Sequence, residues 1–449
     1  MKHIFKKSIY SLMAVAFLMG CEPEIDSEFN PGSADFSRYI AVGASLTLGQ
    51  ADGGTYQASQ EVAFPVLIGQ QIQLAAPNAS SQFRTPILEG DGTGYLRLAG
   101  FTATGATDLA TVDPNPAVFA GPSNFTTDVI PASAISENDI GRFKLRKVDG
   151  DFDNFGIPGM RLSSVTSPSY AIDDVGAAPF ASYFDWNPYY NRLLPATEED
   201  KSYLSLIGEQ DFTFFTCLLG NNDVLQFAAS GGSIDITPSA TFTQLYTLAL
   251  DTLTRNGAQG VVGTIPSVTS AAYFTAISME ETIATYTAVN TMGFYIETEG
   301  GARLATTNDL ILLPASDLLA EVAAENSTAG ASPLDPFPDN LILDSDEIAE
   351  VSQAITQYNN TIRSLATQYG LAVADVNALL TDAEDGFSEN AVTVTTQYIS
   401  GDIFSLDGIH LTPRGNAFLA NLFIDAINLT YGASIPKLDP NQYPGIPLP

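Results

Sequence analysis

The chain has 449 residues, of which 45% are hydrophobic and 15% are charged, and its formal net charge is −33 at pH 7. This length and apolar content are sufficient for a large core. A surface of such strong negative charge repels phosphate backbones, which excludes a nucleic-acid-binding role.

Residues 1–20 have the pattern of a signal peptide. Three lysines precede an apolar stretch over 8–19, which is too short to span a bilayer comfortably. The stretch ends in Leu18-Met19-Gly20-Cys21, which resembles a bacterial lipoprotein processing box, and this predicts a lipid on Cys21. The alternative is an ordinary signal peptide with an incidental cysteine.

Residues 21–37 form an acidic tether after the cysteine. Its acidic residues resemble the surface-export signals of some Gram-negative lipoproteins, although a solvated tether is an equal alternative. We therefore expect an outer-membrane lipoprotein of a Gram-negative bacterium, either periplasmic or surface-exposed. With Cys21 lipidated, Cys217 has no cysteine with which to pair, and no His/Cys cluster indicates a metal site.

Short apolar runs ended by glycine predict buried strands at 39–42 and 212–219. A third strand is predicted at 260–266, leading into a Pro loop, and a fourth is expected at 371–376. Helical spacing of apolar residues predicts helices over 59–74, with a break or start near Pro65, and over 242–253. Asp344 and Glu347 form a capping box before a long helix that ends at Gly370. The last helix begins after Thr412 and ends at Gly432.

Two stretches interrupt this series of predicted strands and helices. Residues 78–150 are rich in Gly, Pro, Ser, Thr and Asn and are expected to form an insertion of loops and small strands. Residues 272–340 are expected to form a second, irregular insertion near the active-site face. The main domain is thus predicted over 38–432, followed by a Pro-rich surface tail over 433–449. Alternating strands and helices predict an α/β fold with a parallel sheet covered on both faces.

The scarcity of histidine singles out one candidate base. The sequence has two histidines, and His3 lies in the signal peptide. His410 follows Asp407 by three residues, so the carboxylate can accept a hydrogen bond from one ring nitrogen and fix the tautomer. A surface histidine near a surface aspartate is the alternative.

The candidate nucleophile is Ser45, in the segment Gly43-Ala44-Ser45-Leu46-Thr47. It follows the first predicted strand directly, so its hydroxyl is expected at the carboxyl edge of the sheet, where ligands bind in such folds. Serine is also common at helix starts for capping reasons, which is the alternative role.

Four motifs in order resemble the SGNH (GDSL-like) hydrolase family. They are the segment around Ser45, Asn154-Phe155-Gly156-Ile157-Pro158-Gly159, Gly220-Asn221-Asn222-Asp223 and Asp407-Gly408-Ile409-His410. The resemblance covers roughly residues 38–432 and implies a three-layer α/β/α sandwich with a central flavodoxin-like sheet.

The resemblance also implies roles for these residues. Ser45 would be the nucleophile, His410 its base and Asp407 the group that orients the base. The backbone N–H groups of Ser45 and Gly159 and the side-chain amide of Asn222 would form the oxyanion hole. The family usually has Asp where this chain has Ala44, so the hydrogen bonds of that carboxylate are absent from the turn.

The expected activity is hydrolysis of carboxylic esters, short-chain acyl or acetyl esters of glycans or lipids, without a cofactor. Acyl transfer to an acceptor sugar would use the same residues. A non-catalytic surface lipoprotein that binds glycan or protein is the other alternative. Six aromatic residues between the second and third motifs would either form a substrate platform or pack an insertion against the core: Phe180, Tyr183, Phe184, Trp186, Tyr189 and Tyr190.

Overall fold

The computed structural model describes residues 29–77, 83–102, 107–120, 144–171, 187–289, 293–389 and 391–449. The predicted signal peptide, Cys21 and most of the acidic tether therefore lie outside the described residues. Among the helices that are described, none is long and apolar enough to cross a membrane.

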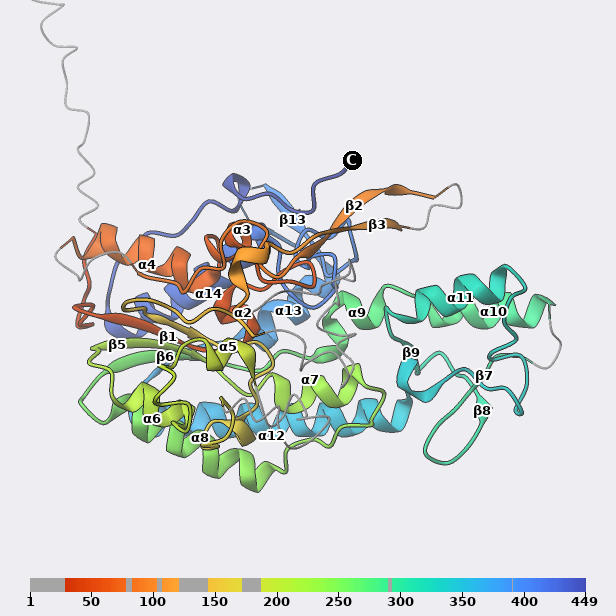
Figure 1. The fold of residues 1–449 in the computed structure, drawn as a ribbon, viewed down its shortest axis with the longest axis horizontal. Helices are drawn as coiled ribbons and strands as arrows, with labels where there is room; N and C mark the ends of the chain where they lie inside the picture. The colour runs from red at the N-terminus through yellow and green to blue at the C-terminus, as the bar shows by residue number, and fades with distance from the viewer. Residues whose placement is uncertain are drawn as a thin grey trace, which may run out of the picture.

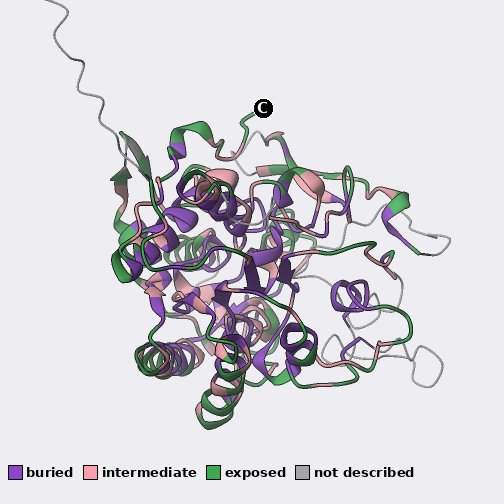
Figure 2. Ribbon diagram, turned by 90° about the vertical axis from the view of Figure 1, so that its left-hand side faces the viewer, coloured by how far each residue is buried: buried purple, intermediate pink, exposed green. Residues whose placement is uncertain are grey.

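A parallel sheet of five strands forms the centre of the molecule, and Figure 2 shows its strands buried between the surrounding helices. The strands are β1 (Tyr39–Gly43), β4 (Asn154–Gly156), β5 (Phe214–Leu218), β6 (Gln259–Gly263) and β11 (Ala372–Ala374). Their spatial order is β11-β6-β5-β1-β4, so in chain order the sheet runs 2-1-3-4-5, as in flavodoxin-like folds. In that order the ligand crevice lies at the carboxyl ends of β1 and β5, where the direction of strand progression reverses.

Helices cover both faces of this sheet (Figure 1). On one face α14 packs against α4, and on the other α8 packs against α12. The predicted three-layer α/β/α fold is confirmed. The helices of the body are α2 (Ser45–Leu48), α3 (Gln57–Gln60), α4 (Phe64–Ala75), α5 (Pro188–Asn191), α6 (Tyr203–Gly208), α7 (Asn222–Ala229), α8 (Ser239–Thr254), α9 (Ala272–Thr275), α12 (Ser345–Tyr369), α13 (Val376–Asp385) and α14 (Pro413–Tyr431).

The two longest body helices begin and end where their capping residues predict. Asp344 accepts from the backbone N–H groups at the start of α12 while Glu347 accepts from the Asp344 N–H, so the capping box is present. Thr412 accepts from Gly415 N at 3.0 Å and caps α14. Gly370 and Gly432 end these two helices in the left-handed conformation.

The first insertion contains an antiparallel hairpin of β2 (Tyr95–Phe101) and β3 (Thr107–Val112).

The tail after α14 lies along that helix. Asn421 hydrogen-bonds both the N–H and the carbonyl of Leu438, and the Arg414 guanidinium donates to the carbonyl of Tyr443 at 3.1 Å. A second short hairpin precedes the Asp407 loop and consists of β12 (Phe387–Glu389) and β13 (Val392–Val394).

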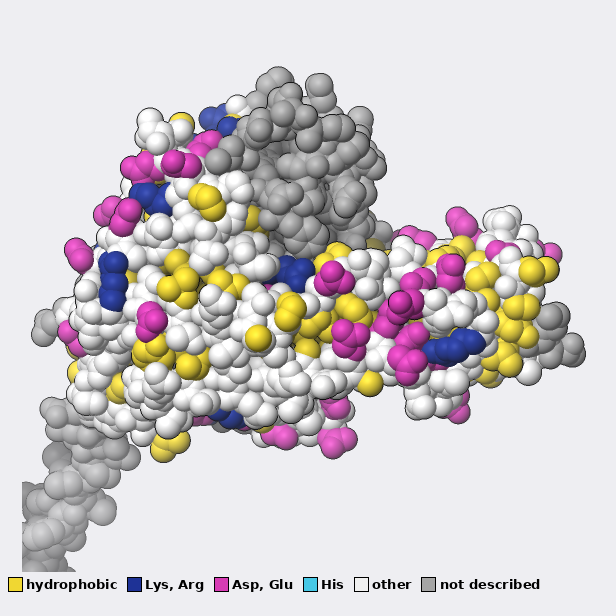
Figure 3. All heavy atoms as spheres, turned by 90° about the horizontal axis from the view of Figure 1, so that it is seen from below, with side chains coloured by type: hydrophobic (Ala, Val, Ile, Leu, Met, Phe, Trp, Pro, Cys, Tyr) yellow, Lys and Arg dark blue, Asp and Glu magenta, His cyan; other side chains and the backbone are white. Residues whose placement is uncertain are grey.

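The second insertion is more regular than the sequence predicted. Residues 277–343, which we call the arm, project from the body in Figures 1 and 3. The prediction of an irregular stretch was wrong, because apolar side chains from these short elements form a small core of their own, which includes Tyr286, Phe294 and Phe337. The elements of the arm are α10 (Met279–Val289), β7 (Tyr295–Ile296), β8 (Arg303–Leu304), β9 (Leu310–Ile311), α11 (Ala315–Ala323) and β10 (Ile342–Leu343).

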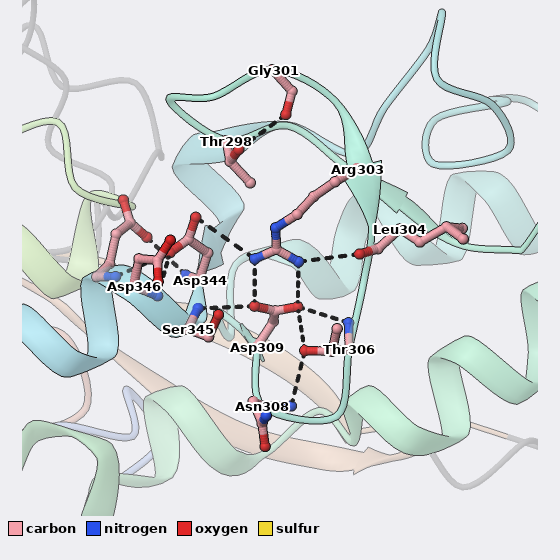
Figure 4. A network of polar contacts seen from close by, with 11 residues as sticks. Thr298, Gly301, Arg303, Leu304, Thr306, Asn308, Asp309, Asp344, Ser345 and Asp346 are labelled. Carbon is pink, nitrogen blue, oxygen red and sulfur yellow. Dashed lines mark hydrogen bonds and ion pairs between the residues drawn. The ribbon is translucent and has the colours of Figure 1, made fainter.

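An ion pair within the arm, whose aspartate is buried, contacts the start of α12 (Figure 4). The Arg303 guanidinium donates to both carboxylate oxygens of Asp309, at 2.7 and 2.8 Å, and the Asp309 side chain is fully buried. Asp309 also accepts from the N–H of Ser345 at 2.9 Å. Burial alone would raise the pKa of Asp309, but the hydrogen bonds from Arg303, Thr306 and Ser345 hold it below its usual value.

Candidate active site

Ser45 lies at the first position of α2, directly after β1. It is partly exposed, whereas Ala44 before it is buried and supplies no side-chain cap to the helix. This agrees with the expectation that replacing the family's Asp with Ala44 removes hydrogen bonds from the turn. The hydroxyl of Ser45 is therefore presented at the carboxyl edge of the sheet, at the end of a central strand.

The second motif supports the Ser45 turn through a fully buried side chain. Asn154 donates from Nδ2 to the carbonyl of Thr47 at 2.7 Å and accepts from the N–H of Gly156 at 2.9 Å. Gly156 must be glycine, because a Cβ there would lie 2.3 Å from the Leu48 nitrogen. Strand β4 can thus approach α2 closely. The sequence motif contains Asn154, but nothing in its pattern indicates this supporting role.

Asp407 and His410 form the pair that the sequence predicts. Asp407 Oδ2 lies 2.8 Å from His410 Nδ1, and both side chains are 7% exposed. The other carboxylate oxygen accepts from the backbone N–H groups of Ile409 and His410, so the three-residue spacing lets the carboxylate turn back on its own loop. Gly408 has φ +73°, and a Cβ at this position would lie 2.6 Å from the Tyr273 nitrogen.

The Asp407 carboxylate is held in its ionised form. Burial would raise its pKa, but the contact with the His410 ring and the hydrogen bonds from His410 and Ile409 lower the pKa far more, to well below the usual range of an aspartate. An ionised Asp407 that accepts from Nδ1 leaves Nε2 of His410 as the proton acceptor. This is the tautomer that a general base requires.

A segment that the sequence analysis did not identify links the Ser45 loop to the His410 loop. Gly53 donates its N–H to Asp407 Oδ2 at 2.7 Å, and the Asp52 carboxylate accepts from the N–H of Leu406 at 2.9 Å. Asp52 has φ +53° and also accepts from the hydroxyl of Tyr56 at 2.6 Å. Burial raises the pKa of Asp52, and the nearby Asp407 charge adds to that effect.

No hydrogen bond joins the Ser45 hydroxyl to His410 in the described part of the chain, where both residues lie. The two loops meet instead through Asp52 and Gly53. In unliganded enzymes the hydrogen bond between nucleophile and base is often long and shortens only with substrate.

The two further oxyanion candidates follow the strands on either side of β1. Gly159 comes after β4 and has φ +75°, and Asn222 begins α7 after β5. Asn222 Nδ2 donates to the carbonyl of Met160 at 3.0 Å, and Gln226 Nε2 donates to the carbonyl of Gly159 at 3.1 Å. Because an amide nitrogen carries two hydrogens, Asn222 retains a second donor.

Asp223, next to Asn222, stabilises this region through its buried side chain. It is fully buried and accepts from the Leu162 N–H at 2.9 Å and from the Thr237 hydroxyl at 2.6 Å. Burial raises its pKa to about 6 although these hydrogen bonds oppose the rise. Its contacts are with the segment after β4 and with Thr237 before α8, so it is a structural residue that the motif pattern could not distinguish from a catalytic acid.

Of the six aromatic residues considered as a substrate platform, only two lie in described residues. Tyr189 and Tyr190 are buried, and Tyr190 packs edge-on against Tyr203. For these two the packing alternative holds. The others, Phe180, Tyr183, Phe184 and Trp186, lie outside the described residues. Nor does any group of His, Cys, Asp or Glu side chains among the described residues have the arrangement of a metal site.

An apolar pocket adjoins the same edge of the sheet. Its empty volume, open mouth included, is about 740 Å³. Leu46, Asn221 and Ile409 line it, and each is the sequence neighbour of a predicted site residue. Chain neighbours of the predicted site residues thus line the pocket, whereas the predicted nucleophile, oxyanion donors and base are not among its lining residues.

Comparison with known proteins agrees with this arrangement. A search of curated proteins finds no match. The family model described as GDSL-like Lipase/Acylhydrolase matches residues 39–423, which includes all four motifs and nearly the whole body. With its flavodoxin-like sheet and the motifs at the strand ends, the chain belongs to the GDSL-like lipase/acylhydrolase family of hydrolases.

Proposed function

We propose that the chain is a serine esterase that hydrolyses carboxylic esters through Ser45, His410 and Asp407. The observation that carries the proposal is the buried Asp407–His410 pair, with 2.8 Å between Oδ2 and Nδ1, at the edge of the sheet where Ser45 follows β1. An aspartate that fixes the imidazole tautomer beside a serine hydroxyl is the arrangement that nucleophilic acyl transfer requires.

In the proposed reaction His410 Nε2 takes the proton of Ser45 as Oγ attacks the ester carbonyl carbon. The carbonyl oxygen becomes an oxyanion that accepts from the N–H groups of Ser45 and Gly159 and from the amide of Asn222. The intermediate collapses, the alcohol leaves with the proton from His410, and water then attacks the acyl-enzyme to release the carboxylic acid. Loss of one oxyanion donor typically costs about 3 kcal/mol of transition-state stabilisation.

We also propose that a lipid on Cys21 anchors the protein to the outer membrane of a Gram-negative bacterium, on its periplasmic or outer face. The support is the processing box in the sequence. Metabolic labelling with a clickable palmitate tests it, because a Cys21→Ser variant should lose the label. Labelling of that variant equal to wild type would contradict the anchor.

Hydrolysis of p-nitrophenyl acetate by the purified protein and by its Ser45→Ala variant tests the esterase. Wild type should turn over and should label with a fluorophosphonate probe, whereas Ser45→Ala should do neither. Equal turnover by both proteins would contradict Ser45 as nucleophile.

Two other functions would show in the same experiment. A fluorophosphonate probe that fails to label Ser45, together with no turnover, would favour the non-catalytic glycan- or protein-binding role, which the uncapped turn at Ala44 supports. Acyl transfer uses the same residues, and it would appear as release of p-nitrophenol that accelerates when a sugar acceptor is added.

A further inference from the structure

A tight turn follows α2 and reaches the loop of the candidate base. Ala51 and Gly54 exchange two backbone hydrogen bonds, each of 2.9 Å, and these close the turn around Asp52 and Gly53. Both central residues have a left-handed backbone, with φ +53° and +75°. This is the pattern of a type I′ turn, in which the N–H groups of the central residues take no part in closing the turn. Those two N–H groups can therefore bind another segment.

Both N–H groups are used on the His410 loop. Asp52 donates to Ser405 Oγ at 2.9 Å, and Gly53 donates to Asp407 Oδ2 at 2.7 Å. Oδ2 is the same oxygen that lies 2.8 Å from His410 Nδ1. Within the described part of the chain, the other donors to the Asp407 carboxylate belong to its own loop. The turn thus supplies the contact that holds this carboxylate from outside the loop.

The Asp52 carboxylate adds a contact in which the loop is the donor. Its Oδ1 accepts from the backbone N–H of Leu406 at 2.9 Å, and its Oδ2 accepts from the Tyr56 hydroxyl at 2.6 Å. The carbonyl of Leu406 in turn accepts from the hydroxyl of Tyr398 at 2.6 Å. The backbone directly before Asp407 is thus held both at its nitrogen and at its carbonyl oxygen.

The first insertion holds the turn as well. Leu96, in β2, donates its N–H to the carbonyl of Asp52 at 2.8 Å. The ring of Tyr56 stacks on the ring of Tyr95, also in β2, with 4.0 Å between the centroids. A residue other than glycine keeps a left-handed backbone only where its surroundings hold it, and such residues are frequent at active sites. The contacts of Asp52 with two separate segments meet that condition.

We propose, building on the esterase function above, that Asp52 is a positioning residue that holds Asp407 and so fixes the orientation of His410 toward Ser45. The turn is closely tied to the nucleophile, because Gln50 donates its N–H to the carbonyl of Ser45 at 3.0 Å. Asp52 does not act on the substrate, and its effect passes through Asp407. A misplacement of catalytic groups by about 1 Å can lower the rate about 100-fold.

The test removes the carboxylate and leaves the turn intact. Asp52→Gly is suited to this, because glycine adopts the left-handed conformation without strain and both N–H donors remain. Its kcat for p-nitrophenyl acetate should fall at least tenfold. Asp52→Asn keeps an oxygen for the Leu406 N–H and also fits a left-handed backbone, so its kcat should be at least threefold above that of Asp52→Gly. A kcat of Asp52→Gly within twofold of wild type would overturn the proposal.

Asp375→Ala is the matched control. Asp375 likewise accepts from a hydroxyl and from a backbone N–H, those of Thr264 and Ala378. It follows β11 at the edge of the sheet, which β6 and β5 separate from β1. This variant should lose thermal stability but keep its kcat. Equal losses of kcat in Asp52→Gly and Asp375→Ala would indicate a general structural role for Asp52 and would overturn the proposal.

A second measurement does not depend on turnover. Once His3 is replaced by glutamine, His410 is the only histidine of the full chain, so labelling with ¹⁵N-histidine gives the signals of one ring. The proton on Nδ1 should exchange with water at least tenfold faster in Asp52→Gly than in wild type, because the Asp407–His410 pair opens more often. Asp375→Ala should exchange as slowly as wild type.

This measurement separates the proposal from the function on which it rests. Unchanged exchange in Asp52→Gly would overturn the positioning role of Asp52 even where Ser45→Ala abolishes turnover. Faster exchange in a protein whose turnover does not depend on Ser45 would support the positioning role and overturn only the esterase.

Discussion

The body and the arm of this molecule are stabilised in different ways. The body has a sheet whose central strands are wholly buried, and the predicted catalytic residues all follow its strands or precede its last helix. The arm has a small core of its own and an ion pair, whose aspartate is buried, that contacts the start of α12. Buried hydrophobic strands therefore position the candidate catalytic residues. The arm is stabilised by a few side chains and contributes none of the candidate catalytic groups.

The largest expected effect lies in the body and concerns activity. Asp407→Asn should lower kcat about 10⁴-fold, because an amide at this position favours the wrong tautomer of His410. Its fold should be retained, since the two residues are nearly equal in size. Steady-state kinetics with p-nitrophenyl esters measures this, and Asp425→Asn on the surface of α14 is the control. A loss of less than tenfold would contradict the assigned role of Asp407.

The next expected effect is a loss of stability in the arm that leaves the body unchanged. Arg303→Ala removes the charged partner of the buried Asp309, which keeps its hydrogen bonds from Thr306 and Ser345. Because the Arg303 side chain is 33% exposed, we expect a loss of about 3 kcal/mol, the low end of the range for buried pairs. Hydrogen exchange in α10 and α11 should accelerate while exchange in the central sheet stays unchanged. Arg363→Ala is the control, because its ion pair with Asp375 is 41% exposed on both sides and should contribute under about 1 kcal/mol. Simultaneous loss of both regions would show that they unfold as one unit.

The pH dependence of stability should differ between the regions. In the body, Asp223 has a folded-state pKa of about 6 against 3.8 for the ordinary carboxyl, so the native state binds its proton where the unfolded state does not. Its contribution to the free energy of unfolding therefore falls by on the order of 3 kcal/mol as the pH rises from about 4 to about 6. Urea titrations of wild type and Asp223→Asn should differ by an amount that changes across that window. A constant difference would contradict the raised pKa.

Asp309 in the arm should respond in the opposite sense. Its pKa is lowered, so its stabilising effect is present above about pH 3.8 and is lost as the pH falls through the folded-state value. Limited proteolysis at decreasing pH should cut the arm before the body. Cleavage of the body first would argue against this assignment.

The smallest expected effect concerns the support of Ser45. Asn154→Ala leaves the Thr47 carbonyl and the Gly156 N–H without their partner, which should cost about 1–3 kcal/mol of stability and also lower kcat. Asn428→Ala is the matched control, since Asn428 makes the same pair of hydrogen bonds to Ile435 far from the site. It should lose stability but keep its kcat. Equal kcat in both variants would mean that Asn154 has no positioning role.

The elements that could be predicted from the sequence are those whose signals are local. Apolar runs ended by glycine predicted β1 and β5, and the short apolar segment before Pro266 predicted β6. The caps at Asp344 and Thr412 predicted where α12 and α14 begin. The pairing of Asp407 with His410 followed from a three-residue spacing within one loop. Such features depend on neighbours in the chain, so periodicity and residue type are sufficient to predict them.

Contacts between segments that are distant in the chain could not be predicted in this way and follow from the three-dimensional packing. Asp52 and Gly53 meet the His410 loop across more than 350 residues of chain, and no periodicity records that contact. The three-residue strand β4 is recognised from its pairing with β1. The core of the arm is recognised from the packing of short segments against one another, of which α10 is only weakly amphipathic. The apolar pocket likewise exists only where ends of several elements converge, because its shape depends on packing rather than on any one segment.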